Sequence, residues 1–318
     1  MKRVAIQLCG HLRSYRETYS SLQKNVVEIL KNEGYDVDIF IHTWTETDTS
    51  QTSWHNLEGN KRGRAITKND EENVIKFYSP KKYLFENQIK VENDFELKEI
   101  LMSMPRQYSA IINSSYTKFR VNKLREEYEK ENNIVYDYVI QTRPDIIFDK
   151  PFGIDMFLSG YKNYGLKPKD NELYCTSVPF RRSNIEPDIF LCSIDLIFFA
   201  KPEVLNSINN LYLDITENKL DLNWIKENLY SLEILWLMYL KMNKIELVKL
   251  KYFQFSDYNI IRDIKNYSKL SEKPDASATI TIKKKKNIKK KIVLELLKLL
   301  PYFISHKKIE KIKNKLKK

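Results

Sequence analysis

Hydrophobic positions change their spacing twice over the first part of the chain. Residues 4–9 (VAIQLC) form a short apolar run that ends at Gly10, which is typical of a strand buried on both faces. Residues 17–31 then carry apolar side chains at helical spacing, and Gly34 follows as a helix stop. In residues 37–44 (VDIFIHTW) the apolar side chains alternate, which predicts a second strand. A strand, a helix and a strand with short connections predict parallel pairing in an α/β sheet.

Strands and helices continue to alternate to about residue 265. Residues 107–132 predict a long amphipathic helix that leads into the β-prone run 136–148 (YDYVIQTRPDIIF). Residues 46–70 are polar and predict a long loop, which inside a compact domain is usually functional or disordered. The remaining predicted elements are an apolar, strand-like stretch at 186–200, helices at 202–214 and 229–243, and a strand at 245–250. We therefore expect a Rossmann-type α/β fold with a mixed, mostly parallel sheet flanked by helices.

The net charge of the chain comes from one segment. The 318 residues include 54 Lys and Arg against 42 Asp and Glu, a formal net charge of +12. Residues 283–318 hold 15 of the basic and two of the acidic residues, so this segment carries +13 and the other 282 residues carry −1. The neutral body argues against a basic nucleic-acid-binding protein. Residues 266–282 predict a linker to the basic tail.

The tail 283–318 combines a lysine run with apolar residues at helical spacing. Its apolar stripe covers about 13 residues, which is too short to span a bilayer, and it is interrupted by Glu295 and Pro301. The pattern predicts an interfacial helix on an anionic membrane surface, with a solvated basic tail or a nucleic-acid patch as alternatives. Because the basic residues are all lysine and aromatics are few, we expect no nucleic-acid partner. The lysines expected at the membrane are Lys283, Lys284, Lys285, Lys286, Lys289, Lys290 and Lys291.

Glycine, cysteine and apolar-run patterns exclude several classes of protein. None of the seven glycines lies in a GxGxxG or GxxxxGK[ST] motif, so both common phosphate-binding loops are missing. The three cysteines are widely spaced in apolar settings, which favours buried thiols in a reducing cytosol over a zinc site. The N-terminal sequence predicts no signal peptide, and no uncharged apolar run reaches the length of a membrane span. We therefore expect the protein to work on the cytosolic side.

Polar side chains gather where three of the predicted strands end. Binding sites in open α/β sheets lie at the carboxyl ends of strands, so three such ends predict one shared crevice. The candidates for binding are Gly10, His11 and Arg13 after the first strand, His42, Thr43 and Trp44 at the end of the second, and Arg143 and Asp145 after the third.

The chemistry of these residues suits a phosphorylated ligand. An Asp at a strand end can ligate a divalent ion that holds phosphate oxygens, and an Arg can contact those oxygens directly. Gly10 permits close backbone approach, and Arg13 near a helix start suits a diphosphate. The alternatives are a surface ion pair between Arg143 and Asp145 and a solvated turn after the first strand. Trp44 either stacks on a base or sugar or packs in the core.

Three blocks occur together at these strand ends: Gly10-His11-Leu12-Arg13, Asp38-Ile39-Phe40-Ile41-His42-Thr43-Trp44 and Thr142-Arg143-Pro144-Asp145. In combination they resemble a family of bacterial glycosyltransferases that build lipopolysaccharide or capsule, with the WavE-like lipopolysaccharide synthesis proteins among its relatives. The resemblance covers residues 1–265 and implies a catalytic domain with a GT-A-like fold. It also implies hexosyltransferase-type transfer from a nucleotide-sugar donor to a growing lipid-linked glycan. Together with the basic tail, the resemblance predicts a peripheral enzyme on the cytoplasmic face of the inner membrane.

The resemblance also implies catalytic groups and a cofactor. Asp188 and Glu233 align with family carboxylates, and together with His42 they are the candidate bases for the acceptor hydroxyl. Glu233 also suits a plain helix-start acid. GT-A enzymes typically carry Asp-x-Asp, where this chain has Arg143 in the first position. Either Asp145 holds a Mn²⁺ or Mg²⁺ ion, or Arg143 neutralises the leaving diphosphate without a metal. The alternative function is a non-catalytic, membrane-associated nucleotide- or glycan-binding protein.

Overall fold

The computed structural model describes residues 2–51, 56, 58, 60–89, 99, 105–163, 167–181, 190–192, 196–223, 225, 232–250, 253 and 257–262. The chain divides into two units, Met1–Tyr267 and Ser268–Lys318. The predicted membrane tail 283–318, with its seven named lysines, and nearly all of the predicted linker 266–282 belong to the second unit, and both segments lie outside the described residues.

Within the described residues, a seven-stranded sheet of order β10-β6-β9-β4-β1-β2-β3 forms the centre of the fold. β4, β1, β2 and β3 are parallel neighbours, β10 is parallel to β6, and β9 runs antiparallel to both β4 and β6. The prediction of an α/β fold with a mixed, mostly parallel sheet is therefore confirmed. The strands are β1 (Lys2–Cys9), β2 (Tyr35–Trp44), β3 (Lys82–Glu86), β4 (Tyr138–Thr142), β6 (Glu172–Cys175), β9 (Ile197–Ala200) and β10 (Glu246–Lys249).

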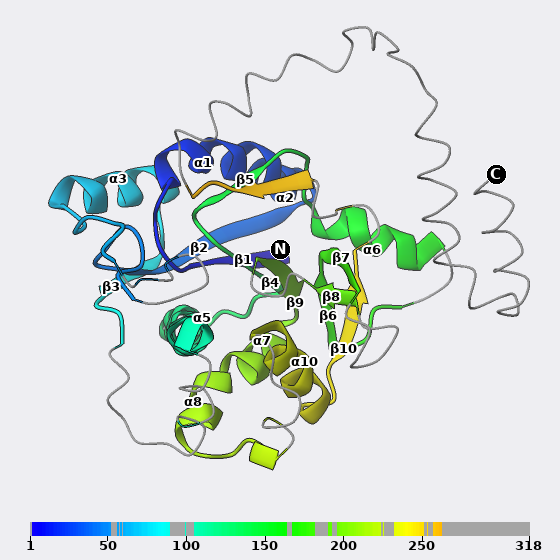
Figure 1. The fold of residues 1–318 in the computed structure, drawn as a ribbon. Helices are drawn as coiled ribbons and strands as arrows, with labels where there is room; N and C mark the ends of the chain where they lie inside the picture. The colour runs from blue at the N-terminus through cyan, green and yellow to red at the C-terminus, as the bar shows by residue number, and fades with distance from the viewer. Residues whose placement is uncertain are drawn as a thin grey trace, which may run out of the picture. The chain divides into compact units, whose positions relative to one another are not determined.

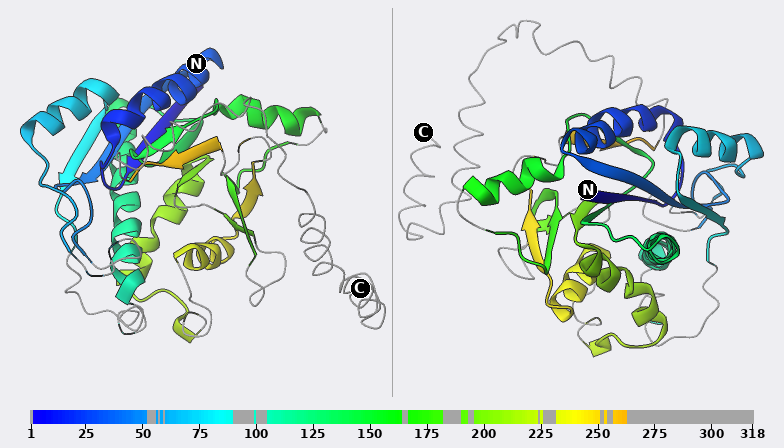
Figure 2. Two further views of the ribbon diagram at one scale, coloured as in Figure 1. Left: turned by 45° about the horizontal axis from the view of Figure 1, so that its top comes forward. Right: turned by 180° about the vertical axis from the view of Figure 1, so that it is seen from behind.

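Helices cover both faces of the sheet (Figures 1 and 2). One face carries α1 (Tyr15–Leu22), the π-helical turn η1 (Gln23–Val27), α2 (Glu28–Asn32) and α3 (Lys68–Tyr78). The other face carries α5 (Pro105–Asn132), α7 (Pro202–Asn209), α8 (Leu211–Thr216) and α10 (Leu232–Met242). The smaller elements are α6 (Ile154–Asn163), the antiparallel pair β5 (Ile146–Phe148) and β11 (Tyr258–Ile260), and the pair β7 (Ser177–Arg181) and β8 (Phe190–Cys192).

Successive residues of β1 belong to two different cores. Val4, Ile6 and Leu8 pack with the α1 side, whereas Ala5 and Cys9 pack with the α5 side. Burial on both faces explains why this strand is a nearly continuous apolar run. The same arrangement buries the polar residues Asp38 and His42 of β2, because α5 packs against the face on which they lie.

Most predicted elements are present, with changes at their ends. The predicted helix 17–31 is the continuous run α1–η1–α2, and the helix predicted over 107–132 is α5. The prediction of one loop over residues 46–70 is wrong at its end, where α3 begins at Lys68. Thr67 and Asp70 form a capping box at this helix start, with each side chain accepting from the other's backbone N–H. β3 was not predicted, and the helix expected over 202–214 is divided into α7 and α8.

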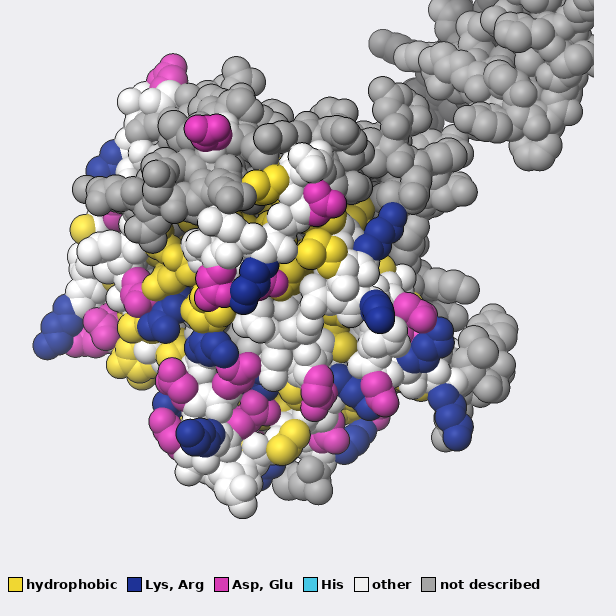
Figure 3. Space-filling model, turned by 90° about the horizontal axis from the view of Figure 1, so that it is seen from below, with side chains coloured by type: hydrophobic (Ala, Val, Ile, Leu, Met, Phe, Trp, Pro, Cys, Tyr) yellow, Lys and Arg dark blue, Asp and Glu magenta, His cyan; other side chains and the backbone are white. Residues whose placement is uncertain are grey.

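Basic and acidic side chains are interspersed over the face seen in Figure 3, which is the lower side of Figure 1. This mixture agrees with the near-zero net charge of residues 1–282. Within the described ranges, no helix combines the length and the apolar character that crossing a membrane would require.

Candidate functional site

The strand order reverses beside β1. From β1 the chain proceeds outward to β2 and β3, and then returns through α5 to β4 on the other side of β1. In open α/β sheets, ligands bind outside the carboxyl ends of the strands at such a switch point. The residues that follow β1 and β4, where the sequence predicted a site, therefore flank the switch point of this sheet.

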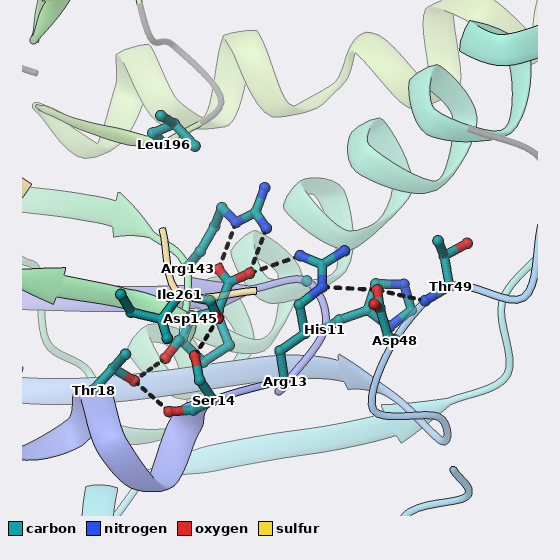
Figure 4. A network of polar contacts seen from close by, with 12 residues as sticks. His11, Arg13, Ser14, Thr18, Asp48, Thr49, Arg143, Asp145, Leu196 and Ile261 are labelled. Atoms are coloured by element: carbon teal, nitrogen blue, oxygen red, sulfur yellow. Dashed lines mark hydrogen bonds and ion pairs between the residues drawn. The ribbon is translucent and has the colours of Figure 1, made fainter. Parts of the chain in front are cut away.

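Asp145 is the centre of an ion-pair cluster that bridges the switch point (Figure 4). Arg143 donates from Nε to Oδ1 (2.8 Å) and from Nη2 to Oδ2 (2.7 Å), and Arg13 donates from Nη1 to Oδ2 (2.7 Å). The Asp145 side chain has no exposed area, and those of Arg13 and Arg143 are 9% and 17% exposed. The alternative of a plain surface ion pair does not describe this buried, three-membered arrangement.

The two arginines keep Asp145 ionised. Burial disfavours the charged carboxylate, but the charges of Arg143 and Arg13 outweigh burial, so the pKa of Asp145 lies well below its ordinary value. Asp145 is therefore a fixed anion that orients two guanidinium groups at the end of β1 and β4.

Helix α1 fixes the turn that carries Arg143 and Asp145. Thr18 Oγ1 donates to the Pro144 carbonyl (2.5 Å), and Ser14 Oγ donates to the Ile261 carbonyl (2.5 Å). The Ile261 N–H in turn donates to the Asp145 carbonyl (2.8 Å). The turn after β4 is thus bound to the start of α1, which follows β1 in sequence.

Arg13 holds a second carboxylate, that of Asp48. Its Nε donates to Asp48 Oδ1 (2.7 Å), which also accepts the Thr49 N–H (2.8 Å). Arg13 has φ of 40°, a left-handed conformation that costs a non-glycine residue about 1 kcal/mol. The Arg13 N–H donates to the Thr47 carbonyl (3.0 Å), so contacts of both backbone and side chain hold this conformation. Thr47 and Asp48, near the start of the predicted loop 46–70, therefore belong to the cluster.

His11 lies beside the cluster as a neutral imidazole. The Glu46 carbonyl can only accept, so Nδ1 donates to it (3.1 Å), and Nε2 accepts from Gln88 Nε2 (2.6 Å). Burial and the charge of Arg13 lower the pKa of His11 to about 4. His11 thus connects the turn after β1 to the segments that follow β2 and β3.

His42 is completely buried, with partners from β3 and α5. Its Nε2 contacts Glu86 Oε2 (2.9 Å) and its Nδ1 contacts Thr117 Oγ1 (2.7 Å). Burial lowers the pKa of His42, and the hydrogen bond from His42 lowers the pKa of Glu86 to about 2. A neutral His42 therefore donates to an ionised Glu86 and accepts from Thr117. Because both ring nitrogens are engaged in the interior, this geometry does not favour His42 as a catalytic base.

The backbone at position 10 adopts a conformation that favours glycine. Its φ is +108°, and a Cβ atom added there would meet nothing within 4 Å. The Gly10 N–H donates to Thr117 Oγ1 (3.1 Å) and to the His42 carbonyl (3.3 Å). The role of Gly10 in diphosphate binding stays a prediction, with its N–H engaged inside the protein.

Trp44 and Thr43 lie in the interior. Trp44 is 2% exposed, and its ring centroid lies 5.1 Å from that of His42 and 6.0 Å from that of Tyr116. The Thr43 hydroxyl is buried without a hydrogen-bond partner among the described residues. This packing matches the alternative of a Trp in the core. The predicted stacking of Trp44 on a ligand would need an exposed ring face, which Trp44 lacks here.

The donor set at Asp145 does not fit a divalent cation. Both carboxylate oxygens accept from guanidinium groups, so a cation would have to displace an arginine and lie against two positive charges. Elsewhere in the described part of the chain, no three or more His, Cys, Asp or Glu side chains are grouped to hold a metal ion.

Two predicted catalytic residues have no described side-chain geometry. Asp188 lies outside the described residues, and Glu233 lies in α10 with a side chain that is not described. Their roles stay predictions. Sequence reasoning missed Asp48, Glu86 and Thr117. Asp48 could have been found from its position in the polar segment that directly follows a strand end. No sequence feature points to Thr117, because its contacts depend on how α5 packs.

In comparisons with known proteins, no family model and no curated protein matches the chain.

Proposed function

We propose that this chain is a glycosyltransferase with a GT-A-like fold. It moves a sugar, by hexosyltransferase-type chemistry, from a nucleotide-sugar donor to a lipid-linked surface glycan of the lipopolysaccharide or capsule type. The observation that carries the proposal is the Arg13–Asp145–Arg143 cluster, which bridges the switch point of a doubly wound sheet. The three motif blocks that resemble the glycosyltransferase family also fall at the ends of β1, β2 and β4.

The cluster supplies what the departure of a nucleoside diphosphate requires. Negative charge develops on the leaving diphosphate, and fixed donors aimed at that charge lower the barrier without reorganising. Asp145 holds both guanidinium groups in one orientation, and Arg13 Nη2 donates to no described residue. Arginine thus provides the positive charge that a metal ion provides beside Asp-x-Asp.

The acceptor hydroxyl needs a base, for which three residues were predicted. His42 is the least suited, because it is buried and both of its nitrogens are bonded. Asp188 and Glu233 remain the candidates that the family resemblance implies.

Membrane association on the cytoplasmic face is the second part of the proposal, and it rests on the composition of residues 283–318. We expect a chain truncated after Ser277 to lose its binding to anionic vesicles while it keeps its affinity for nucleotide sugars. Unchanged vesicle binding of the truncated chain would reject the membrane role.

A thermal-shift panel of UDP-, GDP-, CMP- and ADP-sugars tests donor binding by the full chain. A ligand that binds only the folded state raises the apparent stability. We expect one nucleotide class to stabilise the protein in EDTA as well as in Mn²⁺. If no nucleotide sugar stabilises the chain, the proposed function is wrong.

Two matched variants test whether the arginine cluster is the binding site. Arg143→Lys removes the bidentate fork on Asp145, and we expect at least about a tenfold loss of affinity for the nucleotide sugar that binds. Arg64→Lys is the control, because the Arg64 guanidinium also pairs with a buried carboxylate, that of Asp70, and makes no described contact with the Asp145 cluster. Equal losses in both variants would point to general destabilisation. A transfer assay with the same donor then separates an enzyme from a non-catalytic nucleotide- or glycan-binding protein.

A further inference from the structure

Arg13 holds two carboxylates that differ in what they leave available. Asp145 has no exposed area, and both of its oxygens accept from guanidinium groups. The Asp48 side chain is 22% exposed. Its Oδ1 accepts from Arg13 and from the Thr49 N–H, whereas its Oδ2 accepts no hydrogen bond from any residue that the structure describes. Asp145 is therefore saturated, and Asp48 keeps one oxygen for a ligand.

The charges of the cluster favour a ligand that carries both anionic and neutral polar groups. The positive charges of Arg13 and Arg143 equal the negative charges of Asp48 and Asp145, and His11 beside them is neutral. A site with no net charge gives a plain polyanion little long-range attraction. It suits a ligand that offers phosphate oxygens to the guanidinium groups and hydroxyl groups to a carboxylate.

Asp48 remains an acceptor at neutral pH. Burial opposes its ionisation, but the charge and hydrogen bond of Arg13 outweigh burial, so the pKa of Asp48 lies below its ordinary value. A general base works best with a pKa near the operating pH, which this carboxylate does not have. An ionised carboxylate with one unused oxygen is well suited to accept a hydrogen bond from a neutral hydroxyl group.

We propose that Asp48 recognises the sugar of the nucleotide-sugar donor through a hydroxyl group bound at Oδ2, and that it selects neutral sugars over acidic ones. The inference rests on the proposed function. In such a donor the sugar ring is attached directly to the terminal phosphate, and Arg13 joins Asp48 to the phosphate-binding arginine pair. A phosphate on Arg13 therefore brings the sugar toward Asp48. A uronic acid would place a second carboxylate there and be repelled.

The test compares nucleotide sugars with their nucleoside diphosphates by titration calorimetry of the full chain. The probes are UDP-glucose with UDP, GDP-mannose with GDP, and UDP-glucuronic acid as the acidic sugar. For whichever pair binds, we expect Asp48→Asn to weaken the nucleotide sugar by about 10- to 100-fold. The nucleoside diphosphate keeps or gains affinity, because the variant removes a negative charge beside the arginines.

Two further variants make the result specific. Asp48→Glu keeps the charge beside Arg13 but moves the carboxylate, so we expect it to retain nucleoside diphosphate binding and lose sugar preference. Asp36→Asn is the matched control, since Asp36 is a partly exposed Asp near the opposite end of β2 that pairs with Arg3 at 3.9 Å. We expect no change in either affinity for this variant.

The outcomes separate the inference from the proposed function. Equal loss of both ligands in Asp48→Asn would mean that Asp48 only positions Arg13, and it would overturn the inference while the proposed function stands. No loss in that variant, or tight binding of UDP-glucuronic acid to the wild type, would overturn it in the same way. A wild-type chain that binds none of the probes would reject the proposed function, and the inference with it.

Discussion

Two buried carboxylates in this protein each bind two arginines, and they serve different ends. Asp145 binds Arg143 and Arg13, and Asp70 binds Arg64 and Arg16. Neither carboxylate has exposed area. The arginines differ sharply: Arg64 and Arg16 are 56% and 41% exposed, whereas Arg143 and Arg13 are 17% and 9% exposed.

The difference follows from where each carboxylate lies. Asp70 belongs to the capping box of α3 and also accepts from the Tyr15 hydroxyl (3.1 Å), so it ties the segment before α3 to α1. Asp145 joins the turns after β1 and β4, at the carboxyl ends of neighbouring parallel strands. The same set of charges holds two neighbouring segments together at Asp70, whereas at Asp145 it forms a candidate ligand site. Position in the sheet and exposure of the guanidinium groups distinguish the two.

The largest predicted effect is on stability when Asp145 is removed. Asp145→Ala leaves two mostly buried guanidinium groups without their shared counter-charge, and we expect the free energy of unfolding to fall by about 3–5 kcal/mol. Arg143→Ala should cost less, because Asp145 keeps Arg13. Urea unfolding of the full chain measures both. A loss below about 1 kcal/mol for Asp145→Ala would contradict the role of Asp145 as an anchor.

A pH series tests the Asp145 cluster next, because His11 lies beside it and no histidine contacts Asp70 among the described residues. The pKa of His11 is lowered to about 4 from its ordinary 6.5, by burial first and then by Arg13. Between these values the unfolded chain binds a proton that the folded chain does not, so stability falls as pH falls from 6.5 toward 4. The buried His42 acts in the same direction.

We expect the His11 contribution to reach about 2–3 kcal/mol at pH 4. Urea midpoints from pH 7 to pH 4.5 measure it, and His11→Gln should flatten the slope. An unaltered slope in His11→Gln would contradict the lowered pKa. Below about pH 4 both carboxylates begin to lose stabilisation, because the pKa values of Asp70 and Asp145 are lowered by folding.

The smallest predicted effect is that of Asp70→Ala. The variant loses the capping box and its ion pairs, but Arg64 and Arg16 are already solvated, so we expect a loss of about 1–2 kcal/mol. Nucleotide-sugar affinity should not change. A stability loss equal to that of Asp145→Ala, or a weaker ligand affinity, would remove the distinction between the two clusters.

Much of the fold could be predicted because its hydrophobic spacing is local information. The strand at 4–9, the helix at 17–31 and the helix at 107–132 are all present. The helix α3 was missed although Thr67 and Asp70 carried a capping signal, because its residues follow a long polar segment. Strand direction was predictable only in part: β9 is antiparallel to both of its neighbours, which no local pattern in 186–200 reveals.

For the site, local sequence was enough to find the residues at the strand ends, because a strand ends where apolar alternation gives way to polar residues. Arg13, Arg143 and Asp145 were found in this way. Their contacts with one another depend on the packing of distant segments. Residues 13 and 145 are 132 positions apart, and only the pairing of β1 with β4 brings them within 2.7 Å.

The tertiary structure also separated the buried candidates from the available ones. His42 and Trp44 end a strand just as Arg13 follows one, but α5 covers them and engages their side chains. Asp48 was not predicted as a site residue, because its polar segment contains many similar side chains. Only its contact with Arg13 places it in the cluster. Local sequence fixes where a strand stops. Which strand ends are covered depends on the packing of helices from distant parts of the chain.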